Sequence, residues 1–451
     1  MKTKNKISLL LVLLTLLFTL TLTLTSCAAG SEVIYTKEEL SANVSAETNE
    51  SRQYVWEYLD AWNFPVFDQN KLKKVEKLYR DHYYEEIPSS YELAKAVAND
   101  FLENSYDKTD LESSGMVSDA LLTAFVKAIG DKYSFYRTNE QYEDYTSNMS
   151  GTQPTFYGIG VNVQASLVED GILVIKPIRN SPAYNAGVLA GDMIIAIDGV
   201  AVTEIGYQAA IDRVKGESGT NVVITVRRGE TTLDITVTRG PVIEPTVDYE
   251  LDESGIGYID INSFKKNTDE LFIEAIDYMK ENEAKAIIYD VRDNGGGYLE
   301  TVVNMLDYIA EDGLILASFS NEYDSPEKSR DGHSYAIPTV VLCNRNSASA
   351  SELFTAGLRD LAIMEYFPVT IVGGTKTYGK FVMQNTYTLY DGSAVTLTVA
   401  YYYTPLGNHY NGDGVPLDVD MDADGEPIEN PTASDYLERA YTEANKLLVN
   451  K

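Results

Sequence analysis

Histidine, cysteine and positive charge are all scarce in this chain of 451 residues. Three histidines and no HExxH pair argue against a histidine-based zinc site and against a Ser-His-Asp triad. Two cysteines cannot build a disulfide framework. The chain has 36 lysines and arginines against 68 acidic residues, a net charge of -32. Such a surface repels phosphate backbones, so we expect no nucleic-acid partner.

The first residues have the composition of a targeting segment. Three lysines precede an apolar run over residues 7–24, which ends at Thr25-Ser26-Cys27. An apolar run of this length can nearly span a bilayer, so a transmembrane anchor is the alternative. Small residues before a lone cysteine favour a bacterial lipoprotein signal peptide over 1–26. We therefore expect lipid on Cys27 and attachment to the outer face of the cytoplasmic membrane.

After this segment the pattern of apolar and polar residues changes three times along the chain. Residues 27–52 are small and polar without an apolar period, which predicts a tether. Apolar residues recur at three and four positions over 53–150, as in packed helices. Short β-rich segments fill 155–242. Residues 243–451 alternate apolar strands with helical patterns, so we expect an α/β domain there.

The β-rich region begins with a glycine-bearing loop. Tyr157, Gly158, Ile159 and Gly160 precede a strand that starts at Val161. Glycines let a backbone approach a ligand and direct successive N–H groups at a carboxylate. The following strand can then pair with an extended peptide. Alone, such a loop could be a simple turn into a strand.

Other motifs in the same region make it resemble a PDZ domain. They are Ser181-Pro182-Ala183, Gly191-Asp192-Met193-Ile194, Asp198-Gly199 and Gly219-Thr220-Asn221-Val222. The resemblance implies that the loop from Tyr157 to Gly160, with Val161, binds the C-terminal end of a peptide.

The last region has a serine-rich segment between an apolar strand and a helical pattern. Residues 344–352 read NRNSASASE. Free N–H groups and the dipole at a helix N-terminus favour negative charge, which suits a nucleophile that passes through an oxyanion. A serine and alanine run can equally be a helix cap. For Ser347 and Ser351 we favour that structural role.

A lysine follows in the segment Thr377-Tyr378-Gly379-Lys380, four residues before Gln384. A lysine can act as a general base near pH 7 only if it is neutral, and burial favours the neutral form. Apolar residues follow it at 381–383. The alternative is a solvated loop lysine, which is the commoner case.

Together these segments resemble the C-terminal processing peptidases, the S41 family of Ser/Lys serine proteases with an embedded PDZ domain. The resemblance implies an α/β core of the crotonase/ClpP-like kind and cleavage through an acyl-enzyme without a cofactor. It implies that Ser349 is the nucleophile, Lys380 the general base and Gln384 a residue that positions the lysine. The expected substrates are proteins or peptides with free C-termini.

The family pattern extends to a second segment, Asp290-Val291-Arg292-Asp293-Asn294-Gly295-Gly296-Gly297. The resemblance implies that the N–H groups of Gly296 and Ala350 form an oxyanion hole. Further polar groups are expected to support the site: Asp290, Arg292, Glu352 and Asp360. Residues 131–136, before the PDZ-like region, match the family as well.

Departures from the pattern leave a second function open. Phe381 stands where glycine usually follows the lysine, and it could narrow the cleft or keep Lys380 dry. The segment between Ser349 and Lys380 is also longer than usual, with the surplus in 361–368. The retained dyad favours a serine endopeptidase. The alternative is a catalytically inactive, membrane-tethered peptide-binding adaptor.

Two weaker signals concern partners. Asp420, Asp422 and Asp424 fit the first half of a calcium loop, but Pro431 stands where a bidentate Glu is required, so we favour a solvated acidic turn and expect no metal site. The aromatic residues of 53–150 either pack a core or dock a second copy. The family often dimerises through its N-terminal helices, which implies a homodimer.

Overall fold

The computed structural model describes residues 34–46, 50–165, 171–320, 326–330, 332–421 and 432–449. They fall into two compact units, the described parts of Met1–Asp81 with Ile87–Lys132 and of His82–Glu86 with Tyr133–Lys451. Cys27 and most of the acidic stretch 420–425 lie outside the described residues. Among the helices that are described, none has the length and hydrophobicity needed to cross a bilayer.

The first unit is helical, as expected. Its helices are α2 (Lys37–Ala46), α3 (Val55–Ala61), α4 (Gln69–His82), α5 (Ser90–Asp100) and α6 (Ser114–Ile129), with a π-helical turn at Phe101–Ser105 and a 3₁₀ turn at Tyr106–Lys108. The aromatic side chains of Tyr58, Trp62 and Phe64 are buried, so they pack a core within this unit. The unit is therefore built like other small helical domains, around one apolar centre.

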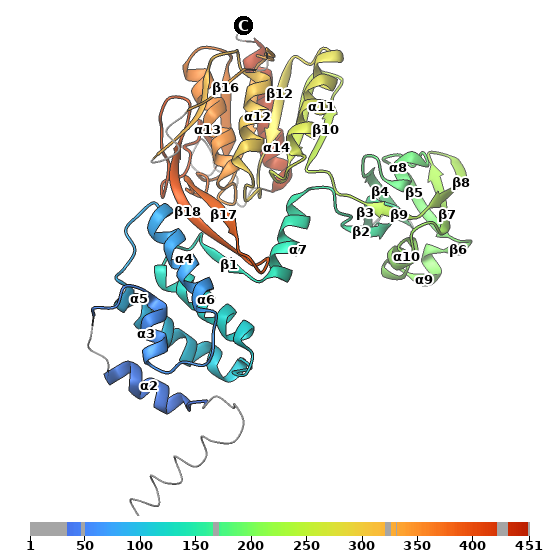
Figure 1. The fold of residues 1–451 in the computed structure, drawn as a ribbon. Helices are drawn as coiled ribbons and strands as arrows, with labels where there is room; N and C mark the ends of the chain where they lie inside the picture. The colour runs from blue at the N-terminus through green and yellow to red at the C-terminus, as the bar shows by residue number, and fades with distance from the viewer. Residues whose placement is uncertain are drawn as a thin grey trace, which may run out of the picture. The chain divides into compact units, whose positions relative to one another are not determined.

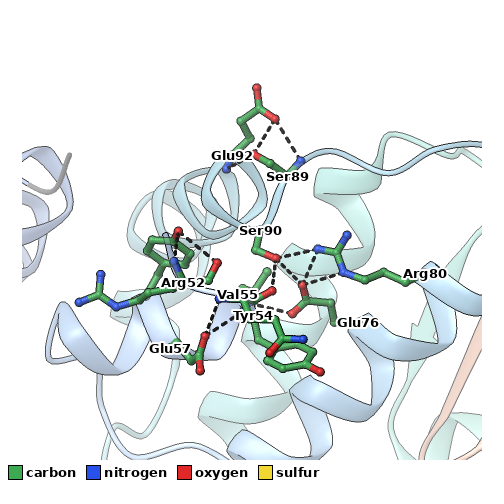
Figure 2. Close-up of polar contacts among 11 residues, drawn as sticks. Arg52, Tyr54, Val55, Glu57, Glu76, Arg80, Ser89, Ser90 and Glu92 are labelled. Atoms are coloured by element: carbon green, nitrogen blue, oxygen red, sulfur yellow. Dashed lines mark hydrogen bonds and ion pairs between the residues drawn. The ribbon is translucent and has the colours of Figure 1, made fainter. Parts of the chain in front are cut away.

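A buried carboxylate joins three helices of this unit (Figure 2). Glu76 on α4 is fully buried. It accepts hydrogen bonds from the backbone N–H of Val55 at 2.8 Å, from Ser90 Oγ at 2.8 Å and from the Arg80 guanidinium at 2.6 Å. A buried charge is tolerated only when it is paired and hydrogen-bonded, and Glu76 meets both conditions.

The tether expected over 27–52 is wrong for residues 37–46, which form α2. Leu40 and Val44, four residues apart, lie on one face of this helix and are buried. The rest of the helix is polar apart from two alanines, so only two large apolar residues signal its packing face.

The PDZ region lies in the second unit. Its main sheet has the order β3-β4-β5-β7-β8, with β6 on β5, and β2 pairs separately with β9. The strands are β2 (Phe156–Gly158), β3 (Val161–Ala165), β4 (Ile172–Pro177), β5 (Met193–Ile197), β6 (Val200–Ala201), β7 (Asn221–Arg228), β8 (Thr231–Thr238) and β9 (Gly240–Val242), and the helices are α8 (Pro182–Asn185), α9 (Val202–Ile205) and α10 (Tyr207–Val214). Strand β3 is an edge of this sheet, so one side of its backbone is free for an added strand.

The α/β core follows, as expected for 243–451 (Figure 1). Its sheet has the order β10-β11-β12-β15-β16-β19, parallel except for β10. The strands are β10 (Val247–Leu251), β11 (Ile256–Ile261), β12 (Ala286–Asp290), β15 (Thr339–Leu342), β16 (Val369–Gly373) and β19 (Val419–Asp420). Alternate strand residues face two apolar layers: Ile287 packs with α11 (Thr268–Glu281), α12 (Leu299–Ile309) and α13 (Ala350–Ile363), and Ile288 with α14 (Ala433–Val449).

A second sheet completes the core. Strands β1 (Phe135–Arg137), β18 (Ala394–Tyr403), β13 (Ile315–Phe319) and β14 (Glu327–Lys328) pair in that order, and β17 (Val382–Thr388) pairs with β18. Residues 133–149, which were expected to belong to the helical region, instead contribute β1 and the helix α7 (Asn139–Met149) to the second unit. The ribbon of β17 and β18 positions the lysine segment, because Lys380 lies two residues before β17.

Candidate active site

Ser349 occupies a sharp turn between β15 and α13. Its backbone angles are φ 57° and ψ -115°, and its side chain is 6% exposed. A positive φ is uncommon for a residue with a Cβ, and it persists where the surrounding structure imposes it. The N–H of Ser349 donates to Glu352 Oε2 at 2.8 Å. The turn is thus fixed from the first turn of α13.

Glu352 connects the serine segment to the lysine segment. This fully buried carboxylate accepts the N–H of Ser349 and, on the other side, the N–H groups of Gly379 and Lys380, both at 2.7 Å. Thr377 Oγ1 donates to it as well, at 2.5 Å. Burial raises the pKa of the Glu352 carboxyl, and these four donors act in the opposite direction. The expected supporting acid therefore ties together the backbones of both proposed dyad residues.

Tyr402 provides a second connection that the sequence did not indicate. Its hydroxyl lies 2.6 Å from Lys380 O and 2.9 Å from Ser349 O, and it donates to this pair of carbonyls. The side chain is fully buried, which raises its pKa well above the usual range and keeps the phenol protonated. One tyrosine in an aromatic-rich strand gives no signal of this role, because the contact depends on where β18 crosses the two loops.

Phe381 does not narrow the cleft, which was one of the two roles expected of it. The side chain is fully buried in the core. Its ring packs against Tyr402 with centroids 4.8 Å apart and against Tyr410 at 5.4 Å. Phe381 therefore supports the ring whose hydroxyl holds the carbonyls of Ser349 and Lys380.

Lys380 is partly buried and its backbone is fixed on both sides, by Glu352 and by Tyr402. Its Nζ lies 4.7 Å from the centroid of the Tyr133 ring. The side chain of Gln384, expected to position the lysine, donates instead to Val382 O at 3.2 Å and to Thr398 Oγ1 at 3.3 Å. The structure thus places the Gln384 amide in the β17–β18 ribbon rather than on the lysine head group.

The glycine loop approaches the serine closely. A Cβ on Gly296, whose φ is 103°, would lie 2.9 Å from Ser349 Cβ and 3.1 Å from Ala350 N, so the approach requires glycine. The N–H of Gly296 donates to Asn294 Oδ1 at 2.9 Å. Ala350 is the first residue of α13, where backbone N–H groups lack an intrahelical acceptor. The expected oxyanion donors are therefore neighbours, but the Gly296 N–H already has an acceptor here.

Side-chain hydrogen bonds lock the glycine loop to the serine loop. Asp293 Oδ1 accepts from Asn346 Nδ2 at 2.8 Å and from Asn344 Nδ2 at 3.0 Å, which lowers the pKa of Asp293. Ser347 Oγ donates to a carbonyl of the glycine segment at 2.7 Å, and so does Ser351 Oγ. Both serines are buried and have the structural role expected of them.

The other supporting residues stabilise the surroundings of the site. Asp290 is buried and accepts from the Arg292 guanidinium at 2.5 Å and from the Tyr258 hydroxyl at 2.8 Å. Asp360, also buried, accepts from residues of the turn after β18, including Leu406 N at 2.9 Å. These groups hold the ends of β12 and β18 and do not reach the dyad.

The expected peptide-binding residues lie at one end of the PDZ sheet. Tyr157 is exposed and Ile159 is buried. Gly160 has a φ of 75°, and its carbonyl accepts the Ser181 hydroxyl at 2.8 Å. The loop leads directly into the edge strand β3, which begins at Val161. This arrangement has the two parts that capture of a chain end needs, a glycine loop and an open strand.

Comparison with known proteins identifies both domains. The model of peptidase family S41 matches residues 255–421, and a PDZ domain model matches residues 173–228. Residues 255–421 thus belong to peptidase family S41, and the domain that precedes them is a PDZ domain. Within the described ranges, no group of three or more His, Cys, Asp or Glu side chains is arranged to hold a metal ion.

Two relatives that match most of this chain share one name. A "Probable CtpA-like serine protease" of Staphylococcus aureus (strain N315) is 31% identical over 359 residues, which cover 79% of this chain and 66% of that protein. A protein of the same name from Staphylococcus haemolyticus (strain JCSC1435) is 30% identical over 322 residues, covering 70% of this chain and 62% of that protein. The chain thus spans slightly less than two thirds of the length of these relatives. Among solved structures, a photosystem II D1 C-terminal processing protease is 24% identical, with 82% of this chain and 95% of that chain covered and a TM-score of 0.45.

Proposed function

We propose that the protein is a serine endopeptidase that captures the C-terminal end of a protein substrate in its PDZ domain and cleaves with a Ser349/Lys380 dyad. The observation that carries this proposal is the shared support of the two residues. Glu352 accepts the backbone N–H of both, and the Tyr402 hydroxyl faces the carbonyls of both. Burying a carboxylate costs free energy unless it is fully hydrogen-bonded. Here its hydrogen bonds hold together two loops that are distant in sequence, which supports a joint role for these loops.

The reaction follows from the chemistry of these groups. Neutral Lys380 removes the proton of the Ser349 hydroxyl while Oγ attacks the scissile carbonyl carbon. The oxyanion that forms is stabilised by the Ala350 N–H and by the glycine loop around Gly296. The C–N bond then breaks, and the leaving amine takes the proton from Lys380. Water, activated by the same lysine, hydrolyses the acyl-enzyme and frees Ser349.

The PDZ domain supplies the substrate class. The carboxylate of a chain end would bind the N–H groups of the glycine loop that includes Gly158 and Gly160, while the last residues pair with edge strand β3. Substrates are therefore proteins with a free, unfolded C-terminus. A peptide with an amidated C-terminus should bind more weakly, because the amide lacks the negative charge.

Two further proposals rest on the sequence alone. Residues 1–26 are a lipoprotein signal peptide, and lipid on Cys27 holds the enzyme at the outer face of the bacterial cytoplasmic membrane. There its substrates are extracytoplasmic proteins. The protein acts as a homodimer joined through its N-terminal helices.

The direct test is cleavage of casein, a loosely folded protein, by the full chain and by Ser349→Ala and Lys380→Ala. We expect both substitutions to abolish cleavage and to leave binding of a peptide with a free C-terminus unchanged. Lys376→Ala, an exposed lysine of the same segment, is the matched control and should cleave normally. Cleavage that survives Lys380→Ala would show that the dyad assignment is wrong.

A second candidate function is a peptide-binding adaptor without activity. The internal hydrogen bond of the Gly296 N–H favours it, because an oxyanion hole needs that donor free. If the wild type and all variants bind the peptide but none of them cleaves casein, the result would support the adaptor.

A further inference from the structure

The head group of the proposed general base rests on an aromatic ring. Lys380 Nζ lies 4.7 Å from the centroid of the Tyr133 ring, within the range of a cation–π contact. No role is assigned to Tyr133 by the comparisons. It begins the long segment of the second unit, Tyr133–Lys451, directly after the last residue of the helical unit, Lys132.

Tyr133 is held in this place by the second sheet. The chain that follows it forms β1, which pairs antiparallel with β18 in the register Phe135 with Thr396. Strand β18 also carries Tyr402, whose pKa is raised chiefly by burial, then by the charge of Glu352 and to a smaller extent by Tyr133. Tyr133 thus lies near Tyr402, in the turn just before a strand that pairs with the strand carrying Tyr402.

The groups around the lysine segment come from several elements. Glu352 on α13 is saturated by its four donors, Tyr402 on β18 is a buried neutral phenol, and burial lowers the pKa of His409 in the loop after β18. Asp413 lies in the loop that packs against Gly379. The electron-rich face of the Tyr133 ring lies against the amine, 4.7 Å from ring centroid to Nζ.

We propose that Tyr133 is a positioning residue for Lys380: its ring holds the lysine head group and sets the pH above which the lysine can accept the serine proton. The inference rests on the proposed function. A ring face attracts an ammonium but not a neutral amine, so the contact stabilises the protonated lysine. It opposes partial burial, which favours the neutral form. The ring therefore raises the pKa of Lys380 relative to the same pocket without it.

The test measures the protonation of Lys380 directly. The full chain is labelled with acetic anhydride at a series of pH values, and mass spectrometry of the Lys380 peptide gives the pH at which the amine becomes reactive. Tyr133→Leu removes the ring and keeps an apolar side chain, so we expect the midpoint to fall by about one pH unit. Tyr133→Phe keeps the ring and should stay near the wild type. Tyr136→Leu, on strand β1 that follows Tyr133, is the control and should change nothing.

Cleavage of casein gives an independent readout. The rising limb of the kcat/KM profile should move to lower pH in Tyr133→Leu by the same amount as the labelling midpoint, whereas a structural defect would lower the rate at every pH. An unchanged labelling midpoint in Tyr133→Leu, or equal midpoints in the Phe and Leu variants, would overturn the inference. If no variant cleaves casein, the proposed function fails, and the labelling still decides the role of Tyr133. Tyr133→Met replaces the Leu variant if that variant does not fold.

Discussion

At the scale of single residues, two side chains connect the backbones of the proposed dyad residues, one as a hydrogen-bond acceptor and one as a donor. Glu352 accepts backbone N–H groups of both segments, and the Tyr402 hydroxyl faces their carbonyls. Ser349 and Lys380 are thereby fixed through their backbones. A small displacement of either segment would separate the reacting groups, so these bridges should affect rate more than substrate binding.

Replacement of Glu352 by Gln tests whether this carboxylate positions the backbones of Ser349 and Lys380. The amide keeps the size of the side chain but directs an NH₂ group at N–H donors, which leaves buried donors unpaired. We expect a loss of about 1–3 kcal/mol in the free energy of unfolding and a fall in kcat of at least about tenfold. Urea unfolding and casein cleavage measure the two effects. Glu365→Gln, at an exposed residue just after α13, is the control. A Glu352→Gln enzyme with wild-type kcat would refute the role.

Tyr402→Phe should have a smaller effect on stability. The ring keeps its packing against Phe381, but the two carbonyls lose their shared donor. We expect a cost of about 1 kcal/mol and a larger proportional fall in kcat than in peptide binding. Thermal unfolding measures the stability cost, and casein cleavage measures kcat. Tyr403→Phe is the control, and equal losses of stability and kcat in the two variants would argue against the role of the Tyr402 hydroxyl.

Phe381→Gly restores the residue that the family pattern has after the lysine, and it tests whether Phe381 is part of the core. Since the side chain is fully buried, its removal should leave a cavity and cost about 3–5 kcal/mol. A stable, more active Phe381→Gly protein would instead show that this side chain obstructs the cleft.

At the scale of elements, the register of the core sheet places carboxylates opposite one another. Asp260 on β11 pairs with Asp290 on β12, and Asp248 on β10 pairs with Asp260. Burial, and then the charge of Asp290, raise the pKa of Asp260 to about 6 from 3.8. Like charges at paired positions are unfavourable, so repulsion among these carboxylates lowers the free energy of unfolding once they are ionised.

The sign of that dependence can be worked out. Because the folded protein holds the Asp260 proton more tightly than the unfolded chain, this residue destabilises the fold increasingly as pH rises from about 4 to about 6. Asp260→Asn should therefore raise the free energy of unfolding at pH 7.5 by on the order of 2 kcal/mol and have little effect near pH 4. Urea unfolding at both pH values tests this, with Glu253→Gln as an exposed control. An equal gain at both pH values would exclude the titration as its source.

The elements that the sequence predicted are those with strong local patterns. The serine-rich segment lies between a strand, β15, and a helix, α13, as its apolar and helical flanks predicted, and strands and helices alternate over 243–451. Helix α2 was missed because only Leu40 and Val44 mark its packing face. Strand β1 was missed because its three residues form a strand only through pairing with β18, which is more than 250 residues away. Tyr133 and Tyr402 could not be predicted for the same reason.

At the scale of the whole molecule, the chain combines a helical unit, a PDZ domain and an S41 peptidase domain. The candidate dyad is assembled from parts that follow β12, β15 and β16, since the ends of neighbouring parallel strands meet at one edge of a sheet. Sequence motifs identified each of the three segments that follow these strands. Which hydrogen bonds join the parts is a tertiary property that no single motif contains.

The most direct test of the dyad is the reactivity of Ser349 toward a fluorophosphonate, which labels only an activated serine. The account predicts that the full chain is labelled at Ser349, that Lys380→Ala abolishes the label and that Lys376→Ala retains it. Labelling can be read by peptide mass spectrometry without knowledge of the natural substrate. Absence of label from Ser349 in the wild type, or its persistence in Lys380→Ala, would contradict a Ser349/Lys380 protease.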